Sequence, residues 1–130
     1  MSAVLLGCLV ALSLVLACSD GEPITPEEAA ARVRVTRVPV ELTRGREAYA
    51  TRCGSCHGPH GEGSDAGPPM LHPYQAEHHA DFAFRRAILE GVRPHHYKLG
   101  SMPPVPDLSE QDVDAIIAYV RWMQRTAGLR

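Results

Sequence analysis

Residues 53–57 read Cys53-Gly54-Ser55-Cys56-His57, a Cys-x-x-Cys-His pattern that occurs once in this chain of 130 residues. The pattern is typical of the covalent attachment of haem c. Its two thiols can add to the two vinyl groups of a haem, and the histidine that follows can bind the iron without help from the rest of the fold. We therefore expect Cys53 and Cys56 to hold one haem c, with His57 as the proximal ligand of its iron.

Two other kinds of site use the same residue types. Cys53, Cys56 and His57 could be three ligands of a zinc ion, with a fourth from another histidine, but structural zinc sites usually bring their ligands in two spaced pairs and no second pair stands out. The two cysteines could also form a redox dithiol. That alternative lacks the βαβ pattern expected around such a motif. Covalent haem remains the favoured interpretation.

The sixth ligand of the iron is expected from Met102, which lies in the stretch GSMPP at residues 100–104. Ligation by histidine and methionine raises the reduction potential relative to two histidines, and it fills both axial positions, which suits electron transfer. Met70 is a second methionine in reach of the motif, and we expect it in the wall of the haem pocket. His95 and His96, close to Met102 in sequence, are the alternative ligands.

The N-terminal stretch has the character of an export signal. Residues 3–17 carry no charge, and their length suits the apolar region of a signal peptide better than a membrane span, which needs about twenty residues. The run ends in Leu16-Ala17-Cys18, which resembles the lipobox of bacterial lipoproteins. The resemblance implies cleavage before Cys18 and a lipid on its sulfur. An ordinary signal peptide, or an uncleaved anchor, is the alternative.

Composition limits what the rest of the chain can do. We expect residues 1–17 to be removed as a signal peptide and residues 42–130 to form a single domain. Residues 18–41 are expected to be a tether or extended N-terminal segment, in which residues 27–34 could form a helical turn or two. The 13 basic and 15 acidic side chains nearly cancel. Without a strongly basic patch, nucleic acid is not expected as a partner.

The periodicity of apolar residues predicts three main helices in the domain. They cover about residues 43–53, residues 81–90 with Asp81 as a possible cap, and a last helix from the N-cap Ser109 to Gly128. The segment between the first two, residues 58–79, is rich in glycine and proline. A loop of this length usually has a function, and here it would wrap the cofactor.

This order of elements, with Cys-x-x-Cys-His after the first helix and Met-Pro before the last, resembles a bacterial class I cytochrome c over about residues 42–127. The resemblance implies a small all-α fold of three main helices around one covalent haem. It also implies that the first and last helices cross near Gly45, Tyr49 and Tyr119. The stretch Gly67 to Leu71 resembles an element in which a proline carbonyl accepts a hydrogen bond from the proximal histidine. Pro68 or Pro69 would take that role.

The resemblance further implies a one-electron carrier, not an enzyme, that meets redox donor and acceptor proteins transiently on the periplasmic or outer face of a bacterial membrane. A cytochrome subunit of a larger oxidase, reductase or dehydrogenase complex is the first alternative, and a haem-based gas sensor is the second. The six remaining histidines of the two loops could together bind a second metal such as copper: His60, His72, His78, His79, His95 and His96.

Overall fold

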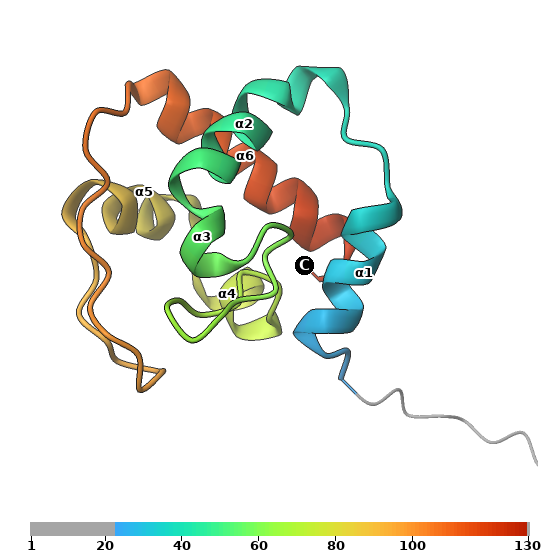
Figure 1. Ribbon diagram of the computed structural model, residues 1–130, viewed down its shortest axis with the longest axis horizontal. Coiled ribbons are helices and arrows are strands. Elements are labelled where there is room, and N and C mark those ends of the chain that lie inside the picture. The colour runs from blue at the N-terminus through green and yellow to red at the C-terminus, as the bar shows by residue number, and fades with distance from the viewer. Residues whose placement is uncertain (1–22, 130) are drawn as a thin grey trace, which may run out of the picture.

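The computed structural model describes residues 23–129, which form an all-α fold, as expected (Figure 1). The described helices are α1 (Pro26–Val35), the short 3-10 helix η1 (Val40–Leu42), α2 (Thr43–Arg52), α3 (Gly54–His57), α4 (Pro73–His78), α5 (Asp81–Glu90) and α6 (Glu110–Thr126). The one β-type pairing among these residues is an isolated antiparallel bridge between Val92 and Met102. Within the same residues, no helix is long and apolar enough to cross a membrane.

Helix α6 is the centre of the fold, and α2 is the helix that packs on it most closely. A Cβ atom on Gly45 would overlap the carbonyl oxygen of Ala115, so only glycine permits this helix crossing. Beside it, the rings of Tyr49 and Tyr119 lie 5.6 Å apart between centroids. The Tyr49 hydroxyl donates a hydrogen bond of 2.9 Å to the carbonyl of Gly58, which fixes the start of the following loop against α2.

The start of α6 follows the predicted capping pattern. The Ser109 hydroxyl accepts a hydrogen bond from the Asp112 N–H, and the Asp112 carboxylate accepts one from the Ser109 N–H. This reciprocal arrangement satisfies two backbone donors that a helix otherwise leaves open. The helix then buries the predicted apolar face: Val113, Ile116, Ile117, Val120 and Met123. Its C-terminus is followed by Gly128, which has a positive φ of 87°.

The segment expected to be a tether differs from that expectation over residues 26–35, which form the helix α1. Thr25 and Glu28 form a second capping box at its start, a sequence signal that the expectation of an extended tether overlooked. Ala29 and Val33, four residues apart and therefore on one face, are buried in the core. The Arg32 guanidinium donates a hydrogen bond of 2.9 Å to the carbonyl of Ala127, so α1 is fastened to the end of α6.

The middle of the chain has one more helix than expected. Within the predicted loop, α4 starts at Pro73, and the His72 ring nitrogen Nδ1 caps it by accepting a hydrogen bond of 3.2 Å from the Tyr74 N–H. Helix α5 has the predicted bounds. Its N-cap position is Ala80, without a side-chain cap, while Asp81 is its first residue and pairs with Arg121 of α6.

Candidate haem site

The Cys-x-x-Cys-His motif folds as a short continuation of α2. At the end of α2, the Cys53 N–H donates a hydrogen bond of 2.8 Å to the carbonyl of Tyr49. The carbonyl of Cys53 in turn accepts a hydrogen bond of 2.9 Å from the His57 N–H, which closes the turn of α3. Cys53 is buried and Cys56 is exposed. Burial, with a smaller contribution from Cys56, raises the pKa of the Cys53 thiol to about 11. The backbone hydrogen bonds therefore fix the motif as one helical turn directly after α2.

The imidazole of His57 is held in one orientation. Its Nδ1 lies 2.8 Å from the carbonyl oxygen of Pro68. Because a carbonyl only accepts, Nδ1 carries the proton, and Nε2 keeps the lone pair that a metal requires. Burial lowers the pKa of His57, and the hydrogen bond to Pro68 opposes this in part, so the ring is neutral at pH 7. The carbonyl beside His57 is that of Pro68 rather than Pro69.

The loop that carries Pro68, residues 58–72, is called the proximal loop below. It packs against α3 through hydrogen bonds to backbone carbonyls of the Cys-x-x-Cys-His motif. The Gly63 N–H donates to the carbonyl of His57 (2.7 Å), and the Ser64 hydroxyl donates to the carbonyl of Cys56 (2.6 Å). A Cβ atom on Gly67 would lie 2.8 Å from that same carbonyl oxygen and 3.1 Å from His57 Nδ1. The approach of the loop to the histidine thus needs a glycine at this position.

On the other side of α3 lies a cavity of about 400 Å³. Its walls are mostly apolar and come from α2, α5, α6 and the segment between α5 and α6, residues 91–108, called the distal segment below. In Figure 1 this segment, coloured tan to orange, runs along the left side of the molecule past α5, and α3 lies nearer the centre. The predicted site residues that line the cavity are Cys53, His57, Pro68, Met70 and Met102, together with the alternative ligands His95 and His96. Cys56 and Pro69 are not among its lining residues.

Met102 reaches this cavity from the distal segment. Its backbone exchanges two hydrogen bonds with Val92, of 2.9 and 3.0 Å. Immediately before Val92, the end of α5 is capped by Gly91, whose positive φ of 78° turns the chain into the bridge. The Val105 N–H donates to the carbonyl of Ile88, which ties the far end of this stretch to α5. Met102 is thereby held on a pair of short extended stretches opposite α3.

Met70 lines the same cavity from the proximal loop, two residues after Pro68. Its N–H donates to the carbonyl of Gly61, and its own carbonyl accepts a hydrogen bond of 3.0 Å from the buried side chain of Gln124. The backbone of Met70 is therefore fixed on the same side as His57. This placement is consistent with Met70 as a wall of the pocket.

Sequence reasoning missed two polar residues of α6 that support the site, Gln124 and Arg121. Arg121 donates to the carboxylate of Asp81, to the side chain of Gln124 and to the carbonyl of His79, and its guanidinium lies 4.7 Å from the centroid of the Phe84 ring. From the sequence, Arg121 has only a favourable place near the end of a helix dipole. Its position next to the apolar face of that helix was the signal for a partly buried role.

These residues fit a covalently bound haem. A buried neutral imidazole with a free Nε2, a thiol and a thioether all border one apolar cavity, and the proximal loop holds the imidazole by hydrogen bonds that leave the cavity side open. When bound, a haem would be held by the thiols of the motif and by His57, with Met102 facing it from the distal segment. The group supplies one-electron iron chemistry, and the chain supplies its orientation and its apolar surroundings.

Comparison with known proteins agrees with this site. Residues 42–124 match the model of the family described as Cytochrome c. Because the match covers more than half of the chain, the chain belongs to the cytochrome c family. Members of the family bind haem c covalently, and this protein is accordingly a haem-c electron carrier with one haem. Neither the curated proteins nor the solved structures contain a match to the chain.

Proposed function

We propose that this protein is a monohaem cytochrome of the bacterial class I type that carries single electrons between redox proteins. In this proposal Cys53 and Cys56 attach the haem, and His57 and Met102 are the axial ligands. The observation that carries it is the 2.8 Å contact between His57 Nδ1 and the Pro68 carbonyl, on a ring that borders the same cavity as Met102. A neutral, oriented imidazole and a thioether on separate segments are a ligand pair suited to electron transfer.

The chain's own contribution is to keep the site nearly unchanged while an electron moves. His57 is held by a carbonyl, and Met102 is held by its backbone bridge to Val92, so neither ligand depends on solvent for its position. The apolar walls disfavour water in the cavity. Partner proteins would dock weakly at its open side, through an interface at the small end of the usual range.

Optical spectra of the haem-loaded protein in both oxidation states test this proposal. We expect a low-spin spectrum in each state, a weak thioether-to-ferric band in the oxidised protein, and no change when carbon monoxide is added to the reduced protein. The Met102→Ala variant is the matched control, because its iron should become open to the gas. Carbon monoxide binding to the unmodified protein would instead favour a haem-based gas sensor with a labile sixth ligand.

A cytochrome subunit of a larger membrane oxidoreductase complex is the second candidate. The observation that favours it is the exposure of two large apolar side chains on α5, Phe82 at 70% and Leu89 at 51%. They are seven residues apart and therefore lie on one face of the helix. Stoichiometric co-purification after mild detergent extraction, lost when both are changed to serine, would favour the subunit. A freely exchanging monomer would favour the carrier.

We also propose that the protein is exported and anchored by a lipid on Cys18. The support is the sequence alone, since Cys18 lies outside the described residues. A single acyl chain binds membranes only marginally, whereas a diacylglyceryl thioether on the cysteine provides two chains. The Cys18→Ala variant should move the protein from the membrane to the soluble periplasmic fraction or stop its processing. Unchanged membrane partitioning would point to another tether.

A further inference from the structure

Three histidines that are not part of the Cys-x-x-Cys-His motif also line the cavity. One ring nitrogen from each of His79, His95 and His96 lies within 4.8 Å of the other two. His79 follows α4, whereas His95 and His96 belong to the distal segment. We propose that these three imidazoles bind a divalent transition-metal ion, with Zn²⁺ and Cu²⁺ as the ions that suit them, at a site separate from the haem iron.

None of the three rings has hydrogen bonds on both of its nitrogens among the described residues, so each keeps a nitrogen that can bind an ion. His95 Nδ1 lies 2.9 Å from the carbonyl of Arg93, so its proton is on Nδ1 and its Nε2 has the lone pair. His96 Nε2 lies 2.8 Å from the hydroxyl of Tyr74, which leaves Nδ1. His79 Nδ1 is buried and has no hydrogen-bond partner among the described residues. A buried nitrogen without a partner is costly, and a nearby ion would compensate for that cost.

Tyr74 positions two of these rings from α4. Its ring centroid lies 4.4 Å from that of His96 and 5.5 Å from that of His79, both in edge-on arrangements. Its hydroxyl also fixes the ring orientation of His96 through the hydrogen bond above. Partners that hold the second nitrogen of a metal-bound histidine are a regular feature of such sites.

The other histidines of the two loops have different surroundings. His72 caps α4, and His78 stacks on Tyr74 with a centroid distance of 4.7 Å. His60 Nδ1 is also buried without a hydrogen-bond partner among the described residues, but it lies 3.7 Å from the carboxylate of Glu62 and has no second histidine beside it. None of the three belongs to the group of nitrogens that converge. The broad expectation of six histidines around a second metal is therefore narrowed to His79, His95 and His96.

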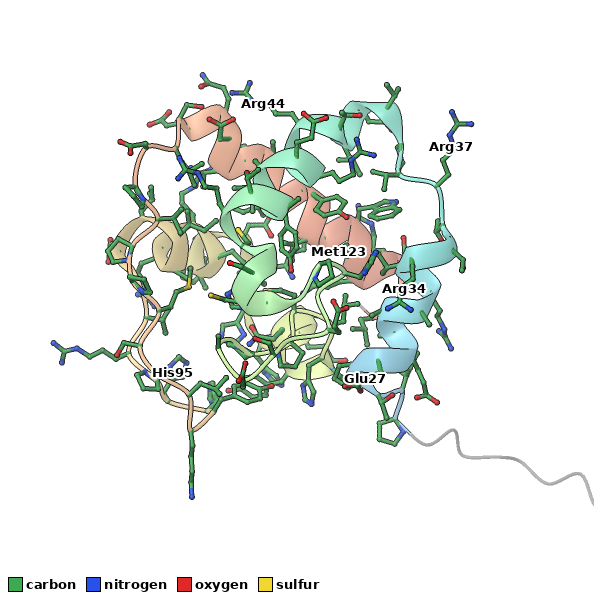
Figure 2. All side chains as sticks on the ribbon, viewed as in Figure 1. Glu27, Arg34, Arg37, Arg44, His95 and Met123 are labelled. Atoms are coloured by element: carbon green, nitrogen blue, oxygen red, sulfur yellow. The ribbon has the colours of Figure 1, made fainter. Side chains whose placement is uncertain are left out.

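The chemistry of the donors selects the class of ion. Imidazole nitrogen suits zinc, copper and nickel, whereas magnesium and calcium require oxygen ligands. In a tetrahedral zinc site with Zn–N bonds of about 2.0–2.1 Å, the ligand nitrogens are roughly 3.3 Å apart. The three nitrogens, now up to 4.8 Å apart, must therefore approach one another by up to about 1.5 Å. His95 and His96 are exposed, and Figure 2 shows His95 on the outer segment, so a small movement of the segment that carries them can close this distance while their ring hydrogen bonds are kept. Three protein ligands would leave a fourth position for water.

The test uses the haem-loaded protein in its oxidised form, titrated with Zn²⁺ by calorimetry. We expect one saturable site, and at least about a tenfold weaker affinity in each of the variants His79→Gln, His95→Gln and His96→Gln. Tyr74→Phe, which removes the hydroxyl from His96, should weaken binding by about tenfold, within the range seen for such supporting residues. His60→Gln is the matched control and should bind Zn²⁺ like the unmodified protein. A low-spin haem spectrum with the thioether-to-ferric band shows that each variant has folded.

Two further measurements make the proposal easy to overturn. Binding of Zn²⁺ should leave the visible spectrum of the haem unchanged, because neither axial ligand belongs to the site, and it should raise the thermal midpoint since only the folded state binds. The proposal is wrong if the haem-loaded protein shows no saturable site. It is also wrong if His60→Gln weakens binding as much as His79→Gln, or if the three cluster variants bind normally. None of these results bears on the role of His57 or Met102.

Discussion

The proximal loop and the distal segment enclose the same cavity but are built very differently. The proximal loop is fastened to the Cys-x-x-Cys-His motif by hydrogen bonds to the carbonyls of Cys56 and His57, and by the His57 ring itself. The distal segment is tied to the rest of the fold mainly at its ends, through the bridge between Val92 and Met102 and the bond from Val105 to α5. Between the two bridge residues most side chains are exposed.

The proximal loop is therefore the rigid half of the site, and the distal segment is the half that can adjust. His57 needs a fixed ring orientation and tautomer, which only a dense set of contacts can impose. A thioether has no proton to place and a flexible side chain, so a short bridge is enough to bring Met102 to the cavity. Substitutions on the proximal side should therefore reduce haem retention or the free energy of unfolding. Substitutions on the distal side should mostly change the absorption spectrum and the reduction potential of the bound haem.

The largest expected effect comes from the attachment cysteines. The double variant Cys53→Ala/Cys56→Ala should retain little or no haem after denaturation, measured as haem that stays with the chain in acidic organic solvent. Its apo chain should also be poorly folded, because a small domain built around an absent group buries too little core. Met102→Ala, on the distal side, should keep its haem under the same treatment. Covalent haem in the double variant would refute the assignment of the motif.

The second largest effect is expected from loss of Met102, the axial ligand that the distal segment supplies. Met102→Ala should lose the weak thioether-to-ferric band and lower the reduction potential by on the order of 100 mV, a fraction of the about 0.8 V over which axial ligands set haem potentials. We expect His95 or His96 to capture the vacated position at neutral pH. Met70→Ala should keep the band, because Met70 belongs to the proximal wall. Loss of the band in the Met70 variant alone would reverse the two assignments.

Substitution of one glycine in each segment compares the rigidity of the proximal loop and the distal segment directly. In Gly67→Ala the new methyl group would meet the Cys56 carbonyl and His57 Nδ1, so we expect a loss of about 1–3 kcal/mol in unfolding free energy. A Cβ atom on Gly100 would have no neighbour within 4 Å, and Gly100→Ala should change stability by less than about 0.5 kcal/mol. Denaturant unfolding of the two haem-loaded variants makes the comparison. Equal losses would contradict it.

The smallest effect concerns the end of the distal segment, where Ser109 caps α6. Ser109→Ala should cost about 1 kcal/mol at neutral pH. Hydrogen bonds from Ser109, then from Arg44, lower the pKa of Asp112 from 3.8 to about 2. A lowered pKa of an acid stabilises the fold above the unfolded value, and this contribution disappears as the pH falls from 3.8 through 2.

The cost of Ser109→Ala should therefore decrease over that interval of pH, as thermal unfolding at several pH values would show. Thr25→Ala removes the corresponding cap of α1, far from the cavity, and serves as the control for position. It should cost a similar amount of unfolding free energy but lose the thioether band only when the whole fold unfolds, whereas Ser109→Ala should lose the band below its unfolding temperature. An identical loss in both variants would mean that the distal segment does not depend on its cap.

Features with local causes can be predicted from the amino-acid sequence of this chain. The spacing of Cys53, Cys56 and His57 is a property of five consecutive residues, and the cap at Ser109 with the apolar period after it specifies α6. The same kind of signal is present at Thr25 and predicts the start of α1. The burial of the apolar face of α1 cannot be predicted in this way, because it depends on α6, about ninety residues further along the chain.

Relations between distant segments follow from the packing of the whole chain. Two adjacent prolines offer equivalent carbonyls in sequence, and the turn at Gly67 places that of Pro68 beside the proximal histidine. Likewise, nothing in the sequence distinguishes His79, His95 and His96 from the other histidines of the loops. They converge because the end of α4 and the distal segment meet at the edge of the cavity. Such contacts depend on how the helices pack, and packing is decided by all the elements at once.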